Sequence, residues 1–299
     1  MTLRTAACLF AWALTALLPS YSAYAETLQG KGGMVASRSD LASEVGKEIL
    51  QSGGNAVDAA VATAFALAVV YPSAGNLGGG GFMLIALQDG TVVAQDNREK
   101  APIAAHRDMF LDADGNVDRN LAVNSLQSSG VPGTVAGVLD ALERYGTMTR
   151  QQVIAPALKL AREGFELNDD LAGQFAENLE GFKQYPASLA KFTQDGQPYK
   201  AGDLWVQTDL ADTLQRISDE GRDGFYKGPV AALIAAEMQR NHVTGGEIDQ
   251  RRRGRVVDGD ELVGHGGEIT EPSLRIMSPA MSEPTVYGGF PHRSTRTRP

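Results

Sequence analysis

The segment that most constrains the fold of this chain is residues 55–70, whose sequence NAVDAAVATAFALAVV is apolar on almost every helical face. Asn55 is a suitable N-cap, and Tyr71 followed by Pro72 predicts the end of the helix. A helix that is apolar all round is buried on all sides. At about 16 residues it is shorter than the roughly 20 needed to cross a bilayer. We therefore expect it inside a protein core.

A glycine-rich run, residues 75–81, follows this helix and leads into two β-rich segments, residues 82–87 and 91–94. Asp89 and Gly90 between them are typical of a β-hairpin turn. A hairpin among apolar helices predicts a layered, mixed α/β (α+β) fold. The pattern also predicts a short strand over residues 33–37. Helical spacing of apolar residues predicts further helices at residues 41–51, 131–145, 149–163, 171–178, 210–219 and 229–240.

The first 25 residues have the pattern of a secretory signal peptide. Arg4 precedes an uncharged apolar run at residues 6–18, and the small residues Ala23 and Ala25 indicate cleavage after Ala25. The run is about 13 residues long, too short for a membrane anchor, so we expect a periplasmic or secreted protein without a stable anchor. The single cysteine, Cys8, lies in this segment, which excludes disulfides and thiolate chemistry from the mature chain.

Residues 242–299 differ in composition from the rest of the chain. They hold 15 apolar residues of 58, eight arginines and no lysine, whereas all eight lysines lie earlier. Eight acidic residues offset the eight arginines, which favours disorder or a shifted reading frame over a basic binding patch. We therefore divide the chain into a signal peptide (residues 1–25), a well-patterned region (residues 26–241) and an atypical tail (residues 242–299).

Several binding chemistries do not fit the sequence. The formal charge of −9 argues against a nucleic-acid partner. The glycines at residues 78–81 are followed by a strand, whereas a phosphate-binding loop requires a lysine and a helix. Residues 112–118 resemble a calcium loop, but their glycine falls at the fourth position, so a polar turn is the better interpretation. His106 is the sole histidine before the tail. We predict neither a metal nor a cofactor.

One charged cluster, residues 96–102, lies at the exit of the second predicted hairpin strand. A partly desolvated guanidinium at Arg98 would form a bidentate partner for a substrate carboxylate, and Asp96 or Glu99 would orient it. An ordinary surface ion pair fits the same residues and is more frequent. The residues themselves leave both interpretations open.

Seven blocks of sequence stand out when they are taken together and in order. They are GGNAVDAAVA at residues 53–62, GNLGGGGF at 75–82, D-x-R-E-x-A-P at 96–102, SGVPGTVAG at 129–137, residues 146–157, residues 160–165, and GFYKG at 224–228. In this order and spacing they resemble the large subunit of the bacterial γ-glutamyltranspeptidase family. The resemblance covers residues 31–241 of this chain, and therefore most of the well-patterned region.

This resemblance implies an N-terminal-nucleophile (Ntn) hydrolase with an αββα four-layer sandwich, here incomplete and with an added helical region. The family cleaves its own precursor into two subunits and transfers the γ-glutamyl group of glutathione to water or to amino acids. Its nucleophile is a threonine at the N-terminus of the small subunit, activated by its own amine. By position, Arg98 corresponds to the arginine that binds the substrate α-carboxylate. Asn97 departs from the family, where a bulkier apolar residue is common.

The tail departs from the resemblance. Thr244, Thr270, Thr285, Thr295 and Thr297 lack the family's surrounding pattern, so no residue here receives the role of nucleophile. We therefore expect a glutathione hydrolase family protein that is inactive by itself and pairs with a small subunit in the intact enzyme. The alternative is a non-catalytic periplasmic module that binds γ-glutamyl compounds or other carboxylates.

The resemblance also predicts incomplete burial. The helix at residues 55–70 and the hairpin at residues 82–94 each require cover on more than one side. In the family fold, part of that cover comes from small-subunit strands. We therefore expect this chain to expose apolar surface.

Overall fold

The structure is a computed structural model and describes residues 30–239 and 274–276. It consists of two units, residues 1–34 and residues 35–299. The predicted signal peptide and almost all of the atypical tail lie outside the described residues. In the first unit, residues 30–34 form neither helix nor strand.

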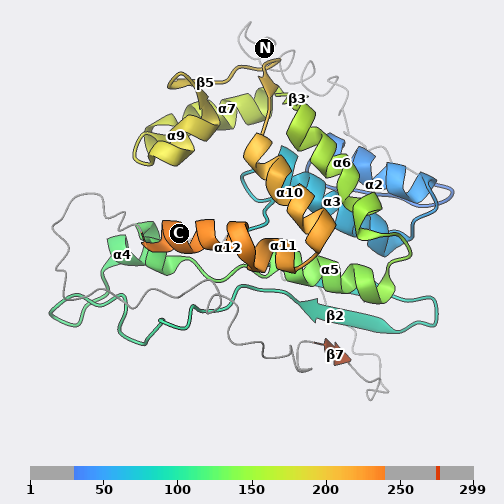
Figure 1. The fold of residues 1–299 in the computed structure, drawn as a ribbon, viewed down its shortest axis with the longest axis horizontal. Helices are drawn as coiled ribbons and strands as arrows, with labels where there is room; N and C mark the ends of the chain where they lie inside the picture. Colours follow the sequence, from blue (N-terminus) through green and yellow to red (C-terminus); the bar gives the residue numbers. More distant parts are fainter. Residues whose placement is uncertain (1–29, 240–273, 277–299) are drawn as a thin grey trace, which may run out of the picture. The chain divides into compact units, whose positions relative to one another are not determined.

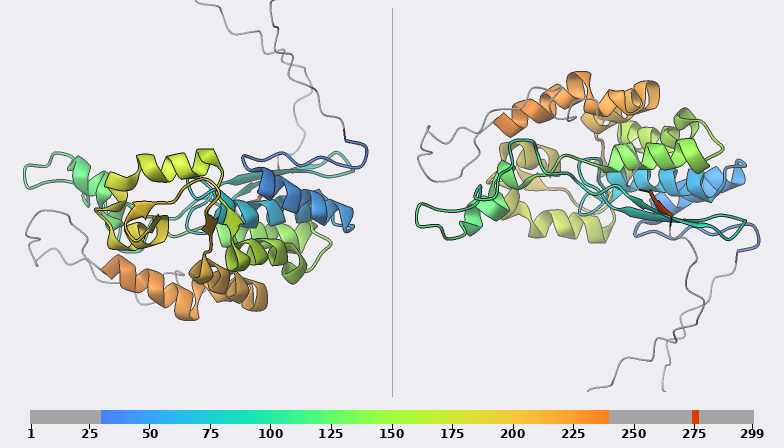
Figure 2. Two further views of the ribbon diagram at one scale, coloured as in Figure 1. Left: turned by 90° about the horizontal axis from the view of Figure 1, so that it is seen from above. Right: turned by 90° about the horizontal axis from the view of Figure 1, so that it is seen from below.

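The apolar segment forms the central helix α3 (Ala56–Val70), as predicted. Asn55 is its N-cap: its side chain accepts hydrogen bonds from the backbone N–H groups of Val57 and Asp58, and Asp58 in return accepts one from the Asn55 N–H. Helix α2 (Asp40–Gln51) lies beside α3 in both ribbon views (Figures 1 and 2). The expected strand at residues 33–37 is not formed. Ser37 instead makes local bonds to Ser39 and Ser43, which lead into α2.

The predicted hairpin is also present, as β1 (Phe82–Ala86) and β2 (Val92–Asp96). The strands pair antiparallel with Ile85 opposite Val93. At the turn, Gly90 has a φ of +86°, a left-handed conformation that favours glycine. A third strand, β7 (Leu274–Ile276), pairs antiparallel with the other edge of β2 and comes from the segment interpreted above as a tail.

Five further helices match predicted ones to within three residues. They are α5 (Thr134–Tyr145), α6 (Arg150–Glu163), α7 (Asp169–Glu177), α10 (Thr208–Glu220) and α12 (Gly228–Gln239). Outside residues 165–205, three short helical elements were not expected: α4 (Arg119–Asn124), the 3-10 helix η1 (Leu126–Ser128) and α11 (Asp223–Tyr226). Among the described residues, no helix is long and apolar enough to cross a membrane.

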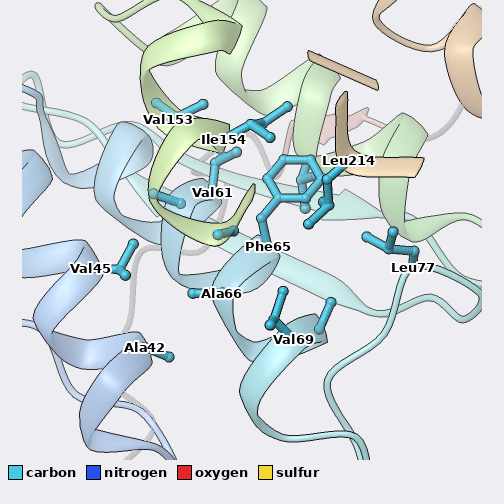
Figure 3. Close-up of a cluster of buried hydrophobic side chains, with 14 of the residues drawn as sticks. Ala42, Val45, Val61, Phe65, Ala66, Val69, Leu77, Val153, Ile154 and Leu214 are labelled. Carbon is cyan, nitrogen blue, oxygen red and sulfur yellow. The ribbon is translucent and has the colours of Figure 1, made fainter. Parts of the chain in front are cut away.

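The core is centred on α3. Figure 3 shows Phe65 and Val61 of this helix among side chains of α2, α6 and α10, including Val45, Ile154 and Leu214. α3 is buried almost completely by these helices and by α5. The expectation that a second subunit would be needed to cover α3 is therefore wrong, because helices of this chain surround it.

Asp58 is a charged group inside this core, with no solvent exposure. Its carboxylate accepts hydrogen bonds from the backbone N–H groups of Asn55, Thr147 and Met148 and from the Thr147 hydroxyl, at 2.6–3.1 Å. Burial raises the pKa of Asp58, but the hydrogen bonds from Thr147, Asn55 and Met148 together outweigh it and hold the pKa below its usual value. The buried carboxylate joins the start of α3 to the turn between α5 and α6.

Residues 165–205 form a small aromatic lobe, of which the sequence predicted only the helix α7. Phe175 contacts the rings of Phe182, Phe192, Tyr199 and Trp205, with centroids 5.1–6.5 Å apart. The lobe consists of α7 together with β3 (Phe165–Glu166), α8 (Leu179–Phe182), α9 (Pro186–Phe192), β4 (Thr193–Gln194), β5 (Gln197–Pro198) and β6 (Leu204–Trp205). Its strands are too short to leave a period in the sequence.

The two faces of the hairpin differ sharply. Figure 1 shows α3, α5 and α6 on the same side of β2, and Ile85 and Val93 are buried on the face toward the core. On the opposite face Phe82, Leu84 and Val92 are 69%, 75% and 52% exposed. The expectation of exposed apolar surface is thus confirmed for the hairpin.

We expect this exposed face to bind a hydrophobic dye and to promote self-association of the chain. Leu84→Lys should lower dye fluorescence and reduce light scattering, and should change the free energy of unfolding by about 0.5 kcal/mol or less, because Leu84 packs on little. Ile85→Lys, one residue further along the same strand, places a charge in the core and should unfold the chain. Equal dye binding by Leu84→Lys and the parent chain would contradict the expectation that this face of the hairpin binds the dye.

Candidate carboxylate-binding site

The backbone of the charged cluster is held on two sides. Asp96 is the last residue of β2, and Asn97 extends the ladder by one residue through two hydrogen bonds with Gly81, of 3.0 and 3.3 Å. Lys100 exchanges two backbone hydrogen bonds with Val131, of 3.1 and 2.7 Å. The residues between, Arg98 and Glu99, therefore leave the sheet on a backbone fixed at both ends.

Glycines from two motifs, residues 75–82 and residues 129–137, pack against this segment. A Cβ added at Gly80 or Gly133 would lie 2.5 or 2.1 Å from the carbonyl oxygen of Asn97, and one at Gly137 would lie 2.2 Å from the Asn97 Cβ. A Cβ at Gly130 would lie 2.7 Å from that of Glu99. No real Cβ tolerates such contacts with backbone. The glycines allow the hairpin exit, the loop before β1 and the start of α5 to approach closely.

The geometry at Arg98 leaves part of its guanidinium free. Its backbone N–H donates to the carboxylate of Asp96 at 2.9 Å, and its Nε donates to Glu99 Oε2 at 3.1 Å. The guanidinium lies over the ring of Phe82 at 5.8 Å from the centroid. Among the described residues, its two terminal Nη nitrogens donate no hydrogen bond, and the side chain is 62% exposed. That edge can donate two parallel bonds to a carboxylate.

Glu99 stays ionised beside Arg98. A hydrogen bond from its own backbone N–H, and then the Arg98 guanidinium, hold the pKa of Glu99 below its usual value. The pair neutralises one unit of positive charge while fixing the orientation of the guanidinium plane. A planar donor whose direction is already set is suited to a carboxylate.

Gly133→Ala tests how closely the glycines support this segment. We expect it to lower the free energy of unfolding by about 1–3 kcal/mol, because its new Cβ would press on the backbone of Asn97 and Arg98. Gly173→Ala in α7 is the matched control, since a Cβ there meets nothing within 4 Å and should stabilise the helix by about 0.5–1 kcal/mol. Urea unfolding measures both. If Gly133→Ala leaves the free energy of unfolding unchanged, the backbone of Asn97 and Arg98 moves to accommodate the new Cβ without cost.

The acidic loop at residues 112–118 behaves as a polar turn. Asp112 accepts hydrogen bonds from the backbone N–H groups of Asp114 and Asn116, both at 2.9 Å, and Asp118 caps α4. Across the described ranges, no three His, Cys, Asp or Glu side chains are grouped as metal ligands would be.

A cavity of about 220 Å³ lies away from Arg98, at the first turn of α2. Its charged groups are of both signs, and Arg38 lies 3.9 Å from Asp170 with both side chains mostly exposed. No polar group in it is both buried and unpaired. The cavity is lined by residues of α2, α3 and the aromatic lobe: Arg38, Ser39, Asp40, Leu41, Val70, Tyr71, Phe165, Glu166, Asn168, Asp170, Leu171 and Gln174.

Two similar solved structures place this mixed fold among the Ntn hydrolases. One is the Helicobacter pylori γ-glutamyltranspeptidase, with a TM-score of 0.72 and 44% identity, over 80% of this chain and 65% of that one. The other is the Pseudomonas nitroreducens γ-glutamyltranspeptidase complexed with L-DON, with a TM-score of 0.68 and 39% identity, over 79% of this chain and 66% of that one. The expected fold class is confirmed.

The family follows from the sequence matches. The model for the γ-glutamyltranspeptidase family matches residues 42–251, and this chain belongs to that family. It is 52% identical over 215 residues to the glutathione hydrolase proenzyme of Escherichia coli (strain K12). The matched region covers 72% of this chain and 37% of that protein. It is 48% identical to that of Pseudomonas sp. (strain A14), over 79% of this chain and 41% of that protein. The chain thus spans about two fifths of these relatives.

Proposed function

We propose that this chain supplies the γ-glutamyl-binding arginine of a glutathione hydrolase. The observation that carries the proposal is the Arg98 guanidinium, oriented by Glu99 through Nε, with two Nη nitrogens that donate to no described residue. Arg98 binds the α-carboxylate of glutathione or another γ-glutamyl compound as a planar, two-point contact.

The acyl-transfer step requires a nucleophile in addition to Arg98. In the proposed reaction, an N-terminal threonine of a small subunit attacks the γ-carbonyl, the peptide amine leaves, and water or an amino acid accepts the γ-glutamyl group. The names of the relatives, which are proenzymes, support processing into two subunits. No threonine of this chain is assigned that role, so the 299-residue polypeptide is proposed to be inactive alone and to need neither metal nor cofactor.

A second candidate is a non-catalytic module that binds γ-glutamyl compounds or other carboxylates. One observation favours it: described residues of this chain, namely Asp96, Glu99 and Phe82, already hold Arg98 in place. Such a module would recognise its ligand without a second subunit.

Titration calorimetry of the full chain separates the two candidates. Glutathione and L-glutamate carry the α-carboxylate, and γ-aminobutyrate is the matched ligand that lacks it. Saturable binding of glutathione and L-glutamate supports the module. The absence of binding supports the incomplete enzyme. Release of p-nitroaniline from γ-glutamyl-p-nitroanilide by the purified chain would contradict the proposed inactivity.

Export is part of the proposal and rests on the sequence of residues 1–25 alone. We propose cleavage after Ala25 and a periplasmic or secreted location. Mass spectrometry of the protein recovered from the periplasm of an expressing cell would give the new N-terminus. A mature protein that starts at Met1 would contradict the proposal. The interpretation of residues 242–299 as disordered or frame-shifted stays a prediction, which resequencing of the gene across that region would test.

A further inference from the structure

The side chain of Asn76 lies at the centre of the glycine loop. Its Oδ1 accepts two hydrogen bonds, one from the backbone N–H of Gly79 and one from the hydroxyl of Thr134, both at 2.8 Å. Its Nδ2 donates to the carbonyl of Ala74 at 3.0 Å. One half-buried oxygen therefore joins the loop before β1 to the first residue of α5, which lies 58 positions further along the chain.

The same loop caps α5. The N-cap residue Gly133 has no side chain to satisfy the free N–H groups at the start of this helix. The carbonyl of Gly79 accepts from the backbone N–H groups of Gly133 and Thr134, at 2.7 and 2.9 Å. The start of the helix thus donates three hydrogen bonds to the loop, one to Asn76 Oδ1 and two to the Gly79 carbonyl.

The loop continues directly beneath Arg98. A Cβ on Gly80 would lie 2.8 Å from the Arg98 Cα, and Gly81 pairs with Asn97 through both backbone groups. Any displacement of Gly79 therefore moves the backbone from which the guanidinium extends. The far side of this backbone is held by Val131, in the segment that leads into α5.

We propose that Asn76 and Thr134 form a clasp that sets the position of Arg98, so that Asn76 is a positioning residue for carboxylate recognition. The clasp acts through Gly79, Gly80 and Gly81 and touches no ligand itself. Its relevance to ligand binding rests on the function proposed above, whereas its effect on the Arg98 backbone does not.

The clasp needs an acceptor oxygen at position 76. Asn76→Asp keeps that oxygen and loses only the bond to Ala74, whereas Asn76→Ala loses both acceptor bonds. Thr134→Ser keeps the donor hydroxyl, and Thr134→Val removes it. Asn178→Ala is the matched control, because it deletes another side-chain amide, bonded to the carbonyl of Gln174 at 2.8 Å, far along the sequence from Arg98.

Hydrogen exchange of the full chain, read by mass spectrometry, tests the clasp without any ligand. Asn76→Ala should speed exchange by about tenfold in peptides that contain residues 79–81 and residues 97–100, as expected for losing one or two hydrogen bonds. Asn76→Asp should restore most of the protection, and Asn178→Ala should leave both peptides unchanged. The proposal would be overturned if Asn76→Ala sped exchange only in residues 76–81. It would also be overturned if Asn76→Ala and Asn76→Asp changed the exchange rates equally.

Calorimetry with glutathione separates this proposal from the proposed function. If the parent chain binds glutathione, Asn76→Ala should weaken binding by about tenfold and Asn76→Asp should rescue it. A further outcome is that hydrogen exchange follows the order expected for the variants but the parent chain does not bind glutathione. That outcome supports the clasp and argues against the independent module. Binding that Asn76→Ala leaves unchanged overturns the clasp.

Discussion

Arg98→Lys lowers kcat/KM for a γ-glutamyl anilide by roughly 30- to 900-fold in an enzyme that joins this chain to the remaining region of its Escherichia coli relative. This range corresponds to about 2–4 kcal/mol, the loss expected when a bidentate, charge-assisted pair in a closed site becomes a single contact. Lysine keeps the charge, but its ammonium cannot reproduce the planar fork. Because a carboxylate contact forms on binding, most of the effect should fall on KM.

Arg107→Lys is the matched control for this experiment. Arg107 donates through Nε to the adjacent Asp108 at 3.0 Å, the same local pairing that Arg98 makes with Glu99, yet its side chain is 93% exposed. Such a surface pair contributes little, so kcat/KM should stay within about twofold of the parent value. An unchanged kcat/KM for Arg98→Lys would remove Arg98 from the binding site.

Much of the helical frame was predictable because its signals are local. The apolar run with its Asn55 cap predicted α3 to within one residue, and Asp89 with Gly90 predicted the hairpin. The short strands of the aromatic lobe were missed because two residues cannot show a period. The lobe forms because Phe165, Phe175 and Trp205 meet across the chain, and no local pattern encodes such a meeting.

The site was predictable only in part. Charge and position identified the cluster around Arg98, but the residues alone favoured an ordinary surface pair, and only the family resemblance gave Arg98 a role. The motif glycines were visible in the sequence, but their purpose was not. Gly80 and Gly133 are required because both approach the carbonyl of Asn97, a contact between segments distant in the chain. Asn76 was hidden for the same reason, since its partner Thr134 is 58 residues away.

Asp58 lies in a sequence motif that gives no sign of its role, although it is the most strongly hydrogen-bonded buried charge that the structure describes. Two of its partners, Thr147 and Met148, are 89 and 90 residues away, so the sequence gives no sign of the connection. Three backbone N–H groups and one hydroxyl point at its carboxylate. Removing the carboxylate would leave these donors buried without acceptors, at a cost of about 1–3 kcal/mol each in unfavourable cases.

Asp58→Ala should therefore lower the free energy of unfolding by about 3–5 kcal/mol, measured by urea unfolding near pH 7. Thr147→Val removes one donor and should cost about 1–2 kcal/mol, so it remains measurable if Asp58→Ala does not fold. Asp118→Ala, which deletes a single N-cap bond at the exposed helix α4, is the control and should cost about 1 kcal/mol or less.

The pH dependence of stability gives this prediction a second test. Because the pKa of Asp58 is lowered on folding, its contribution is complete above the unfolded-state pKa of about 3.9 and is lost as the pH falls through the lower native value. Asp58→Asn lacks the ionised group at every pH. The stability gap between the parent chain and Asp58→Asn should accordingly be constant from about pH 5 to 7 and narrow below pH 4. A gap that does not change with acidification would mean that the hydrogen bonds to Asp58 do not depend on its charge.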